Sequence, residues 1–145
     1  MILFIEGNIF HSKCQTLVNP VNCMGVMGKG LALQFKSRYP GSEASYKKAC
    51  ERNLLSPGML MLWRGQPHWV LQFPTKDKWW NNSHISYIEE GLKKFVATYH
   101  EQGITSIAFP MLGCGEGKLS KDKVSEMLKK YLEPLDITCE VYNRK

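Results

Sequence analysis

Two glycine-rich stretches, each preceded by an apolar segment, are the parts of the sequence best suited to hold a ligand. They occupy residues 18–30 and 107–117. Glycine can adopt positive φ, and it lets the backbone approach a ligand closely. A strand that leads through such a loop into a helix presents free N–H groups and a positive dipole end, which favours phosphate. Two such loops predict a ligand with two phosphate groups, whereas the alternative for each is an ordinary tight turn.

The other reactive side chains show no metal-binding or catalytic spacing. The five cysteines form no C-x-x-C pair and no zinc-ribbon pattern, so we expect free thiols in a reducing cytoplasm and no metal. Cys23 and Cys114 lie in the glycine-rich stretches, where we expect small buried side chains. The four histidines are scattered. Residues 24–30 lack the register of a Walker A loop, which excludes a magnesium–nucleotide role, and no cofactor is expected.

Length and composition predict one soluble α/β domain spanning residues 1–145. The chain is 43% hydrophobic and 22% charged, with no apolar run long enough to cross a membrane. Its first residues, Met1–Gly7, are typical of a strand and not of a signal peptide. The formal net charge of +6 favours anionic partners such as nucleic acid or phosphate-bearing ligands. Lysines between residues 118 and 130 form either a solvated helix face or a contact for a nucleic-acid backbone.

The apolar periodicity predicts strands that alternate with helices. Strands are expected at residues 2–5, 15–18, 59–64, 68–73, 106–109 and 137–142, with the third and fourth joined as a hairpin by residues 65–67. Four helices are expected, beginning after Lys29, Ser42, Ser83 (or Asn82) and Ser120. For the second, third and fourth helices, these residues are the expected N-caps. This order favours a mixed, mainly parallel sheet with helices on both faces. Ligands bind such sheets beyond the carboxyl ends of the strands, where both glycine-rich loops would meet.

Four spaced motifs together resemble the macrodomain family. They are Gly7-Asn8-Ile9, residues 19–35, Phe73-Pro74-Thr75-Lys76 and Leu112-Gly113-Cys114-Gly115. The closest likeness within the family is to the macrodomain of the DNA ADP-ribosyl glycohydrolase antitoxins (DarG type), with the human terminal ADP-ribose protein glycohydrolase as a further relative. The resemblance covers essentially the whole chain. It implies a three-layer α/β/α macrodomain that binds ADP-ribose at the carboxyl end of its sheet.

The resemblance also implies roles for individual residues. Asn8 takes the adenine-contacting position, where most macrodomains carry Asp, and Asn22 lies near the distal ribose. The second glycine loop wraps the diphosphate, and Gly117 stands where the human relative has an Asp, which leaves Glu116 as an unassigned acid. The implied catalytic residues are Lys76 and Asn22. The implied ADP-ribose contacts are Asn8, Ile9, Asn22, Gly25, Val26, Met27, Gly28, Lys29, Gly30, Thr75, Gly113, Cys114, Gly115, Glu116 and Gly117.

Lys76 has a chemical rationale of its own once the ligand is ADP-ribose. A neutral amine can attack the anomeric carbon C1″, or the opened aldehyde, to form a Schiff-base-type intermediate that water resolves. Desolvation or a neighbouring cation favours the neutral amine, and Lys78 is a candidate for that cation. The alternative is a solvated loop lysine, which is the usual state of this residue type.

The expected function is therefore removal of ADP-ribose from thymidine bases in DNA. Hydrolysis of ADP-ribose linked to protein Glu or Asp, and non-catalytic binding of ADP-ribose, are the alternatives. The expected partners are ADP-ribose, ADP-ribosylated single-stranded DNA and a cognate ADP-ribosyltransferase toxin, with no membrane partner, for a cytoplasmic monomer. Trp79 and Trp80 either stack on an unpaired base or leave at least one ring packed in the core.

Overall fold

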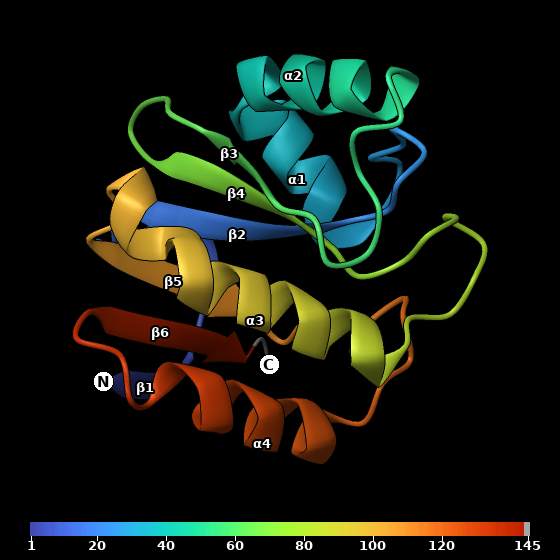
Figure 1. Ribbon diagram of the computed structural model, residues 1–145. Helices are drawn as coiled ribbons and strands as arrows, with labels where there is room; N and C mark the ends of the chain where they lie inside the picture. The colour runs from blue at the N-terminus through green and yellow to red at the C-terminus, as the bar shows by residue number, and fades with distance from the viewer. Residues whose placement is uncertain (144–145) are drawn as a thin grey trace.

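The computed structural model describes residues 1–143 and is built around a six-stranded sheet between two layers of helices (Figure 1). The strand order is β1-β6-β5-β2-β4-β3, and all neighbours pair in parallel except β3 and β4, which are antiparallel. This confirms the predicted mixed, mainly parallel α/β fold. The strands are β1 (Ile2–Glu6), β2 (Thr16–Val21), β3 (Met61–Trp63), β4 (Trp69–Pro74), β5 (Ser106–Pro110) and β6 (Thr138–Asn143).

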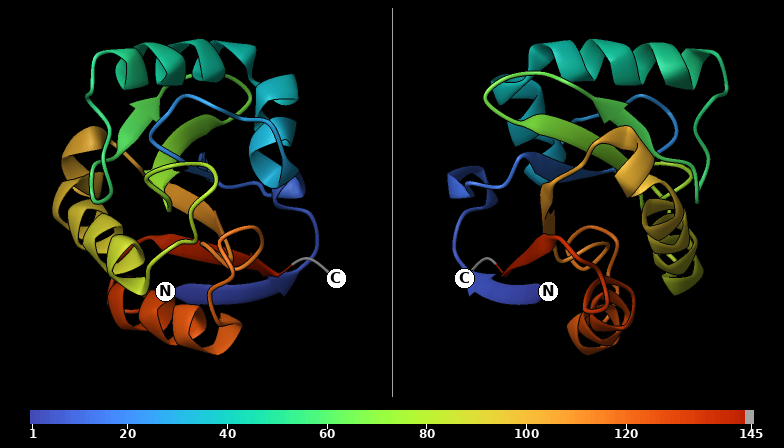
Figure 2. Two further views of the ribbon diagram at one scale, coloured as in Figure 1. Left: turned by 90° about the vertical axis from the view of Figure 1, so that its right-hand side faces the viewer. Right: turned by 60° about the vertical axis from the view of Figure 1, so that its left-hand side comes forward.

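The helices pack in two pairs on opposite faces of the sheet, as the two views of Figure 2 show. One pair is α1 (Gly30–Arg38) and α2 (Pro40–Glu51), with the short helix η1 (Ile9–His11) beside it; the other is α3 (Ile85–Gln102) and α4 (Lys121–Leu132). Successive residues of a strand point to opposite faces. Leu17 of β2 therefore joins the apolar cluster under α1, whereas Val18 joins the cluster under α3 and α4.

The sequence signals at the helix ends agree with the structure in part. Gly103 ends α3 in the left-handed region at φ 81°, and the hydroxyl of Ser120 caps α4 by accepting from the N–H of Lys123 at 3.4 Å. The predicted cap at Ser42 is wrong. Because proline fits the first turn of a helix, α2 already begins at Pro40, and Ser42 lies inside it with its hydroxyl donating to the Tyr39 carbonyl at 2.9 Å.

The start of α3 also differs from the prediction. Neither Asn82 nor Ser83 is the N-cap; that position belongs to His84, whose side chain makes no capping hydrogen bond. The predicted apolar face of the helix is confirmed, since Ile88, Leu92 and Phe95 are fully buried against the sheet. Within residues 1–143, no helix combines the length and apolar character that crossing a bilayer requires.

Helix α3 lies unusually close to β4, and Gly91 makes this approach possible. A Cβ built at Gly91 would overlap the ring of Phe73, which is fully buried in β4 one residue before Pro74. The seat of α3 on the sheet therefore depends on the absence of a side chain at this position. The contact between Gly91 and Phe73 also positions the end of β4, just before the loop that carries Lys76.

We predict that Gly91→Ala destabilises the protein. Alanine would gain about 1 kcal/mol of helix propensity, but forcing a methyl group into the packed ring of Phe73 costs about 1–3 kcal/mol. The expected net change is a loss of free energy of unfolding, measured by urea denaturation. Lys94→Ala, at an exposed position of the same helix, is the control and should change stability little. A Gly91→Ala protein more stable than wild type would show that α3 is free to move away from β4.

Candidate functional site

Three neighbouring parallel strands deliver their following loops to one edge of the sheet. In the order β5-β2-β4, the strands lead respectively into the second glycine loop, the first glycine loop and the segment that carries Lys76. Because parallel strands end at the same edge, all three loops meet there, as Figure 1 shows. The structure thus brings together the three parts of the sequence that were expected to form one site.

The sheet opens between the two glycine loops. β2 pairs with β4 along its whole length, from Thr16 opposite Trp69 to Val21 opposite Pro74. Its pairing with β5 is confined to Thr16 with Ile107 and Leu17 with Ala108. The carboxyl ends of β2 and β5 are therefore not held together by a ladder.

Pro20 prevents the ladder between β2 and β5 from reaching the end of β2. The carbonyls of Gln15 and Val21 accept from Trp69 and Thr75, so the odd-numbered positions of β2 face β4. The backbone hydrogen-bonding groups of successive residues point to opposite sides of a strand, so those of Pro20 face β5. Proline has no backbone N–H to give to a ladder. The residue that interrupts the sheet thus lies directly before the first glycine loop.

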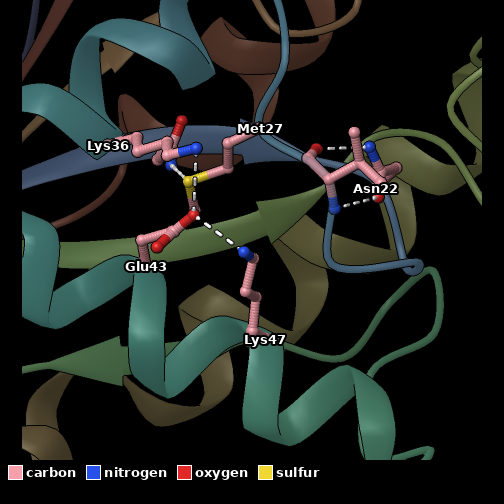
Figure 3. Close-up of polar contacts among 7 residues, drawn as sticks. Asn22, Met27, Lys36, Glu43 and Lys47 are labelled. Atoms are coloured by element: carbon pink, nitrogen blue, oxygen red, sulfur yellow. Dashed lines mark hydrogen bonds and ion pairs between the residues drawn. The ribbon is translucent and has the colours of Figure 1, made fainter.

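Asn22 holds the first glycine loop together through its side-chain amide (Figure 3). Its Oδ1 accepts from the N–H of Met24 at 2.9 Å and of Val26 at 3.4 Å, and its Nδ2 donates to the Val26 carbonyl at 2.8 Å. The side chain is nearly buried. The loop then turns at Gly25, whose φ of 83° favours glycine. Asn22 therefore acts on the loop itself, and its predicted proximity to a ribose stays a prediction.

Tyr46 of α2 contacts Asn22 and stabilises this loop. Its hydroxyl lies 2.8 Å from both the backbone carbonyl oxygen and Oδ1 of Asn22, and the side chain is fully buried. Burial raises the pKa of the phenol, so it remains a hydrogen-bond donor at all ordinary pH values. Helix α2 is joined to α1 by an ion pair, since Oε2 of Glu43 lies 3.6 Å from Nζ of Lys36 in α1. The same oxygen lies 3.4 Å from Nζ of Lys47 in α2 (Figure 3).

The loop after β4 is attached to the first glycine loop by main-chain groups. The N–H of Cys23 donates to the carbonyl of Asp77 at 2.9 Å, and the N–H of Thr75 donates to that of Val21, also at 2.9 Å. Lys76 lies between these two ties. It is half-buried, and its Nζ donates to the carbonyl of Trp79 at 3.3 Å. The amine is thus held against its own loop, whose backbone is tied to the first glycine loop.

The two tryptophans of this loop are both exposed, so the alternative in which at least one packs in the core is wrong. Trp79 and Trp80 keep 50% and 56% of their surface accessible. They are the two central residues of a turn closed by the N–H of Asn81 and the carbonyl of Lys78. The other tryptophans, Trp63 and Trp69, lie on β3 and β4 and are partly buried.

Close packing fixes the shape of the second glycine loop. Gly113 has φ 72°, and a Cβ there would lie 2.7 Å from Cδ1 of Leu119. A Cβ at Gly117 would overlap the hydroxyl of Ser83, whose N–H donates to the Gly117 carbonyl at 3.1 Å. These two glycines are therefore required by sterics. Gly115 has open space around it, so its lack of a side chain leaves the backbone accessible.

Both glycine loops present unused backbone donors. Helix α1 begins directly after the first loop and has no side-chain cap. Unpaired donors and a helix N-terminus together attract anions. The N–H groups of Gly28, Lys29 and Gly30 in the first loop, and those of Gly115, Glu116 and Gly117 in the second, make no hydrogen bond within residues 1–143.

The remaining predicted contact residues are placed in different ways. Asn8 lies directly after β1 and caps η1, its Oδ1 accepting from the N–H of Phe10 at 3.0 Å. Ile9, Met27 and Thr75 are buried, so the side chains of Ile9 and Met27 belong to the core under α1 and α2. Glu116 is exposed at the tip of the second loop.

The thiols of the two loops are unsuited to nucleophilic chemistry. Burial raises the pKa of the Cys23 thiol to about 12, with the nearby Asp77 carboxylate adding to the effect, and burial also raises that of Cys114. Both side chains are partly buried, as expected, and all five cysteines are free thiols. The structure within residues 1–143 gathers no cluster of His, Cys, Asp or Glu able to hold a metal ion.

Two shallow hollows on the surface lie away from the glycine loops. One is lined by Ile85 together with Lys123 and Met127 of α4, and the other by Phe4 with Lys129 and Glu133. Neither contains a glycine-loop residue or Lys76, so they offer no unused donors of the kind found at the sheet edge. The candidate site is instead defined by the convergence of the three loops.

Two structural features of the site were missed at the sequence level. Tyr46 was not distinguished from any other aromatic on an amphipathic helix, because its partner Asn22 lies 24 positions away. Pro20 was read as part of a motif, and its effect on strand pairing depends on which neighbour it faces. No signal within the sequence alone reports either relationship.

Comparisons with known proteins show which family and which enzymes this chain is similar to. A Macro domain model matches residues 18–128. A DNA ADP-ribosyl glycohydrolase of Thermus aquaticus is 42% identical over 94% of this chain and 39% of its own length. A DNA ADP-ribosyl transferase–DNA ADP-ribosyl glycohydrolase fusion protein of Thermosipho africanus is 36% identical over 95% of this chain and 40% of its own. The chain thus spans about two fifths of the length of these relatives.

A solved structure matches the fold closely. Thermosipho africanus DarTG in complex with ADP-ribose superposes with a TM-score of 0.94 at 36% identity, covering 99% of this chain and 41% of that one. Together with the family model, this similarity confirms the predicted fold class.

We predict that Tyr46→Phe loosens the first glycine loop. The variant removes the buried hydroxyl that contacts Asn22, which costs about 1–2 kcal/mol of stability, and amide hydrogen exchange at Met24 and Val26 should become faster. Tyr142→Phe, which removes a hydroxyl bonded to Glu140 at 2.9 Å on β6, is the control and should leave exchange in that loop unchanged. Unchanged exchange in Tyr46→Phe would mean that Asn22 organises the loop without help from α2.

Proposed function

The chain belongs to the Macro domain family, and on that premise we propose that it is an ADP-ribosyl glycohydrolase that removes ADP-ribose from thymidine bases in DNA. The observation that supports the proposal is the position of Lys76, whose loop is tied by main-chain hydrogen bonds to the first glycine loop at the edge where three parallel strands end. The 42% identity to a DNA ADP-ribosyl glycohydrolase supports the same reaction. We take residues 1–145 as a single macrodomain.

In this proposal the free N–H groups of the two glycine loops bind the diphosphate of ADP-ribose. The donors of residues 28–30 and of 115–117 flank the opening between β2 and β5, and the N-terminus of α1 adds its positive dipole end. The backbone of Asn8 and Ile9, at the end of β1, contacts the adenine side. This arrangement directs the distal ribose toward the third loop, which carries Lys76.

Lys76 is the nucleophile of the proposed reaction. Its amine nitrogen forms a bond to C1″ of the ribose while the bond from C1″ to the base breaks, and the base leaves with a proton. The resulting adduct opens to a Schiff base, and water then adds to C1″ and expels the amine, giving free ADP-ribose. Asn22 contributes by keeping the first glycine loop in shape, through its bonds to Met24 and Val26. The exposed Glu116 has no assigned role.

The proposed partners follow from the substrate and the relatives. ADP-ribosylated single-stranded DNA is the substrate, and a cognate ADP-ribosyltransferase that makes the modification is the counterpart enzyme. One relative is a fusion of a DNA ADP-ribosyl transferase with such a glycohydrolase, which supports this pairing. We propose action in the cytoplasm, as a monomer.

The proposal predicts that Lys76→Ala lowers the release of ADP-ribose from modified single-stranded DNA by about 1,000-fold or more, because the nucleophile is lost. Lys76→Arg should be equally inactive, since a guanidinium keeps the charge without a nucleophilic amine. Lys94→Ala, on the outer face of α3, is the control. Release is followed by chromatography of free ADP-ribose, and borohydride should trap the adduct on the wild type only.

Four results would contradict the proposal. Equal release by wild type and Lys76→Ala would remove Lys76 from the mechanism. Full activity of Lys76→Arg would make its role electrostatic. Faster release from protein Glu or Asp esters than from DNA would favour the protein-directed reaction, and tight binding of ADP-ribose without release from any conjugate would favour a non-catalytic binding module.

A further inference from the structure

Two adjacent tryptophans stand exposed beside Lys76, and nothing in the proposed reaction uses them. Trp79 and Trp80 expose about half of their surface, although tryptophan is among the residues with the largest gain from burial. Their rings meet edge to face, with centroids 5.3 Å apart and planes at 89°. In such a pair, the ring that presents its edge keeps both faces free of its partner. The loop therefore offers flat aromatic surface to a ligand.

The surroundings of the tryptophan pair are apolar and cationic. Met24 and Val26 of the first glycine loop are 44% and 40% exposed, and their loop is tied to the tryptophan loop through Cys23 and Asp77. The ammonium of Lys78 lies 5.6 Å from the centre of the Trp80 ring. Among residues 1–143, Lys78 has no carboxylate partner in an ion pair. Aromatic faces and an uncommitted cation together match the bases and backbone of a nucleic acid.

A hydrogen bond joins the tryptophan pair to the amine of Lys76. Nζ of Lys76 donates to the backbone carbonyl of Trp79 at 3.3 Å, and both tryptophans lie inside the turn that the N–H of Asn81 closes on the carbonyl of Lys78. A DNA strand whose modified nucleotide presents its ribose to Lys76 can therefore stack a neighbouring base on this loop. The same short loop can hold the polymer and carry the nucleophile.

We propose that Trp79 and Trp80 form a stacking platform for the unpaired bases of single-stranded DNA next to the modified nucleotide, with Lys78 at its phosphate backbone. The inference rests on the proposed function for its choice of polymer and deepens it by assigning where the strand lies. Stacking needs bases that are not stacked within a duplex, so the platform selects single strands. The positive net charge of +6 favours the same partner.

The test measures binding of an unmodified, fluorescently labelled single-stranded oligothymidylate at fixed ionic strength, by anisotropy. The double variant Trp79→Ala/Trp80→Ala should bind about tenfold or more weakly than wild type. Trp79→Phe/Trp80→Phe keeps aromatic faces and should recover most of the affinity. Leu54→Ala, at an exposed apolar position outside the site, is the matched control. Binding to the wild type should also quench its tryptophan fluorescence, which needs no variant.

The outcomes separate this inference from the proposed function. Equal oligonucleotide binding by wild type and the alanine double variant, or equal competition by duplex DNA of the same sequence, would overturn the platform while leaving the release of ADP-ribose intact. Oligonucleotide binding that depends on both rings, in a protein that releases no ADP-ribose from DNA, would support the platform and remove the proposed reaction. Lost binding in both the alanine and phenylalanine variants, with unchanged thermal melting, would show that stacking is not the contact.

Discussion

The site depends on the way β2 is paired with its two neighbours. Full pairing with β4 locks the Lys76 segment to the first glycine loop, and the short pairing with β5 leaves the second glycine loop free to stand apart. A ladder complete on both sides would draw the loops together over the sheet edge. A ladder broken on both sides would let the three loops drift. With Pro20 facing β5, the carboxyl end of β2 stays paired with β4 but not with β5.

The loops at this opening owe their shape to groups that do not face the ligand. Asn22 uses its amide to satisfy backbone donors and acceptors of its own loop, and the buried Tyr46 hydroxyl orients that amide. In the second loop, Leu119 and Ser83 fill the space that side chains at Gly113 and Gly117 would need. Because these contacts consume no donor from residues 28–30 or 115–117, the backbone N–H groups stay available for an anion. Pre-organisation of this kind lowers the entropic cost of binding.

The sequence was informative where a single residue type has a local reason for its position. Alternating apolar segments and the Ser120 cap were predicted from neighbours a few positions away. The convergence of the two glycine loops also followed, because parallel strands end at the same edge of a sheet. The predicted Ser42 cap failed because Pro40 starts the helix two residues earlier, with Tyr39 at the N-cap position. The sequence left the placement of Trp79 and Trp80 open, and their exposure is a property of the folded loop. The Tyr46 contact with Asn22 had no local signal at all.

The junction between Cys23 and Asp77 has a consequence for how such a protein can diversify. The bond joins a main-chain N–H to a main-chain carbonyl, so it persists whatever side chains the two residues carry. Substitutions at the exposed residues that follow Asp77 can therefore leave the backbone of Lys76 in place relative to the first glycine loop. The proposed contacts with the DNA strand and the proposed reaction can then change independently, even though only a few residues separate them.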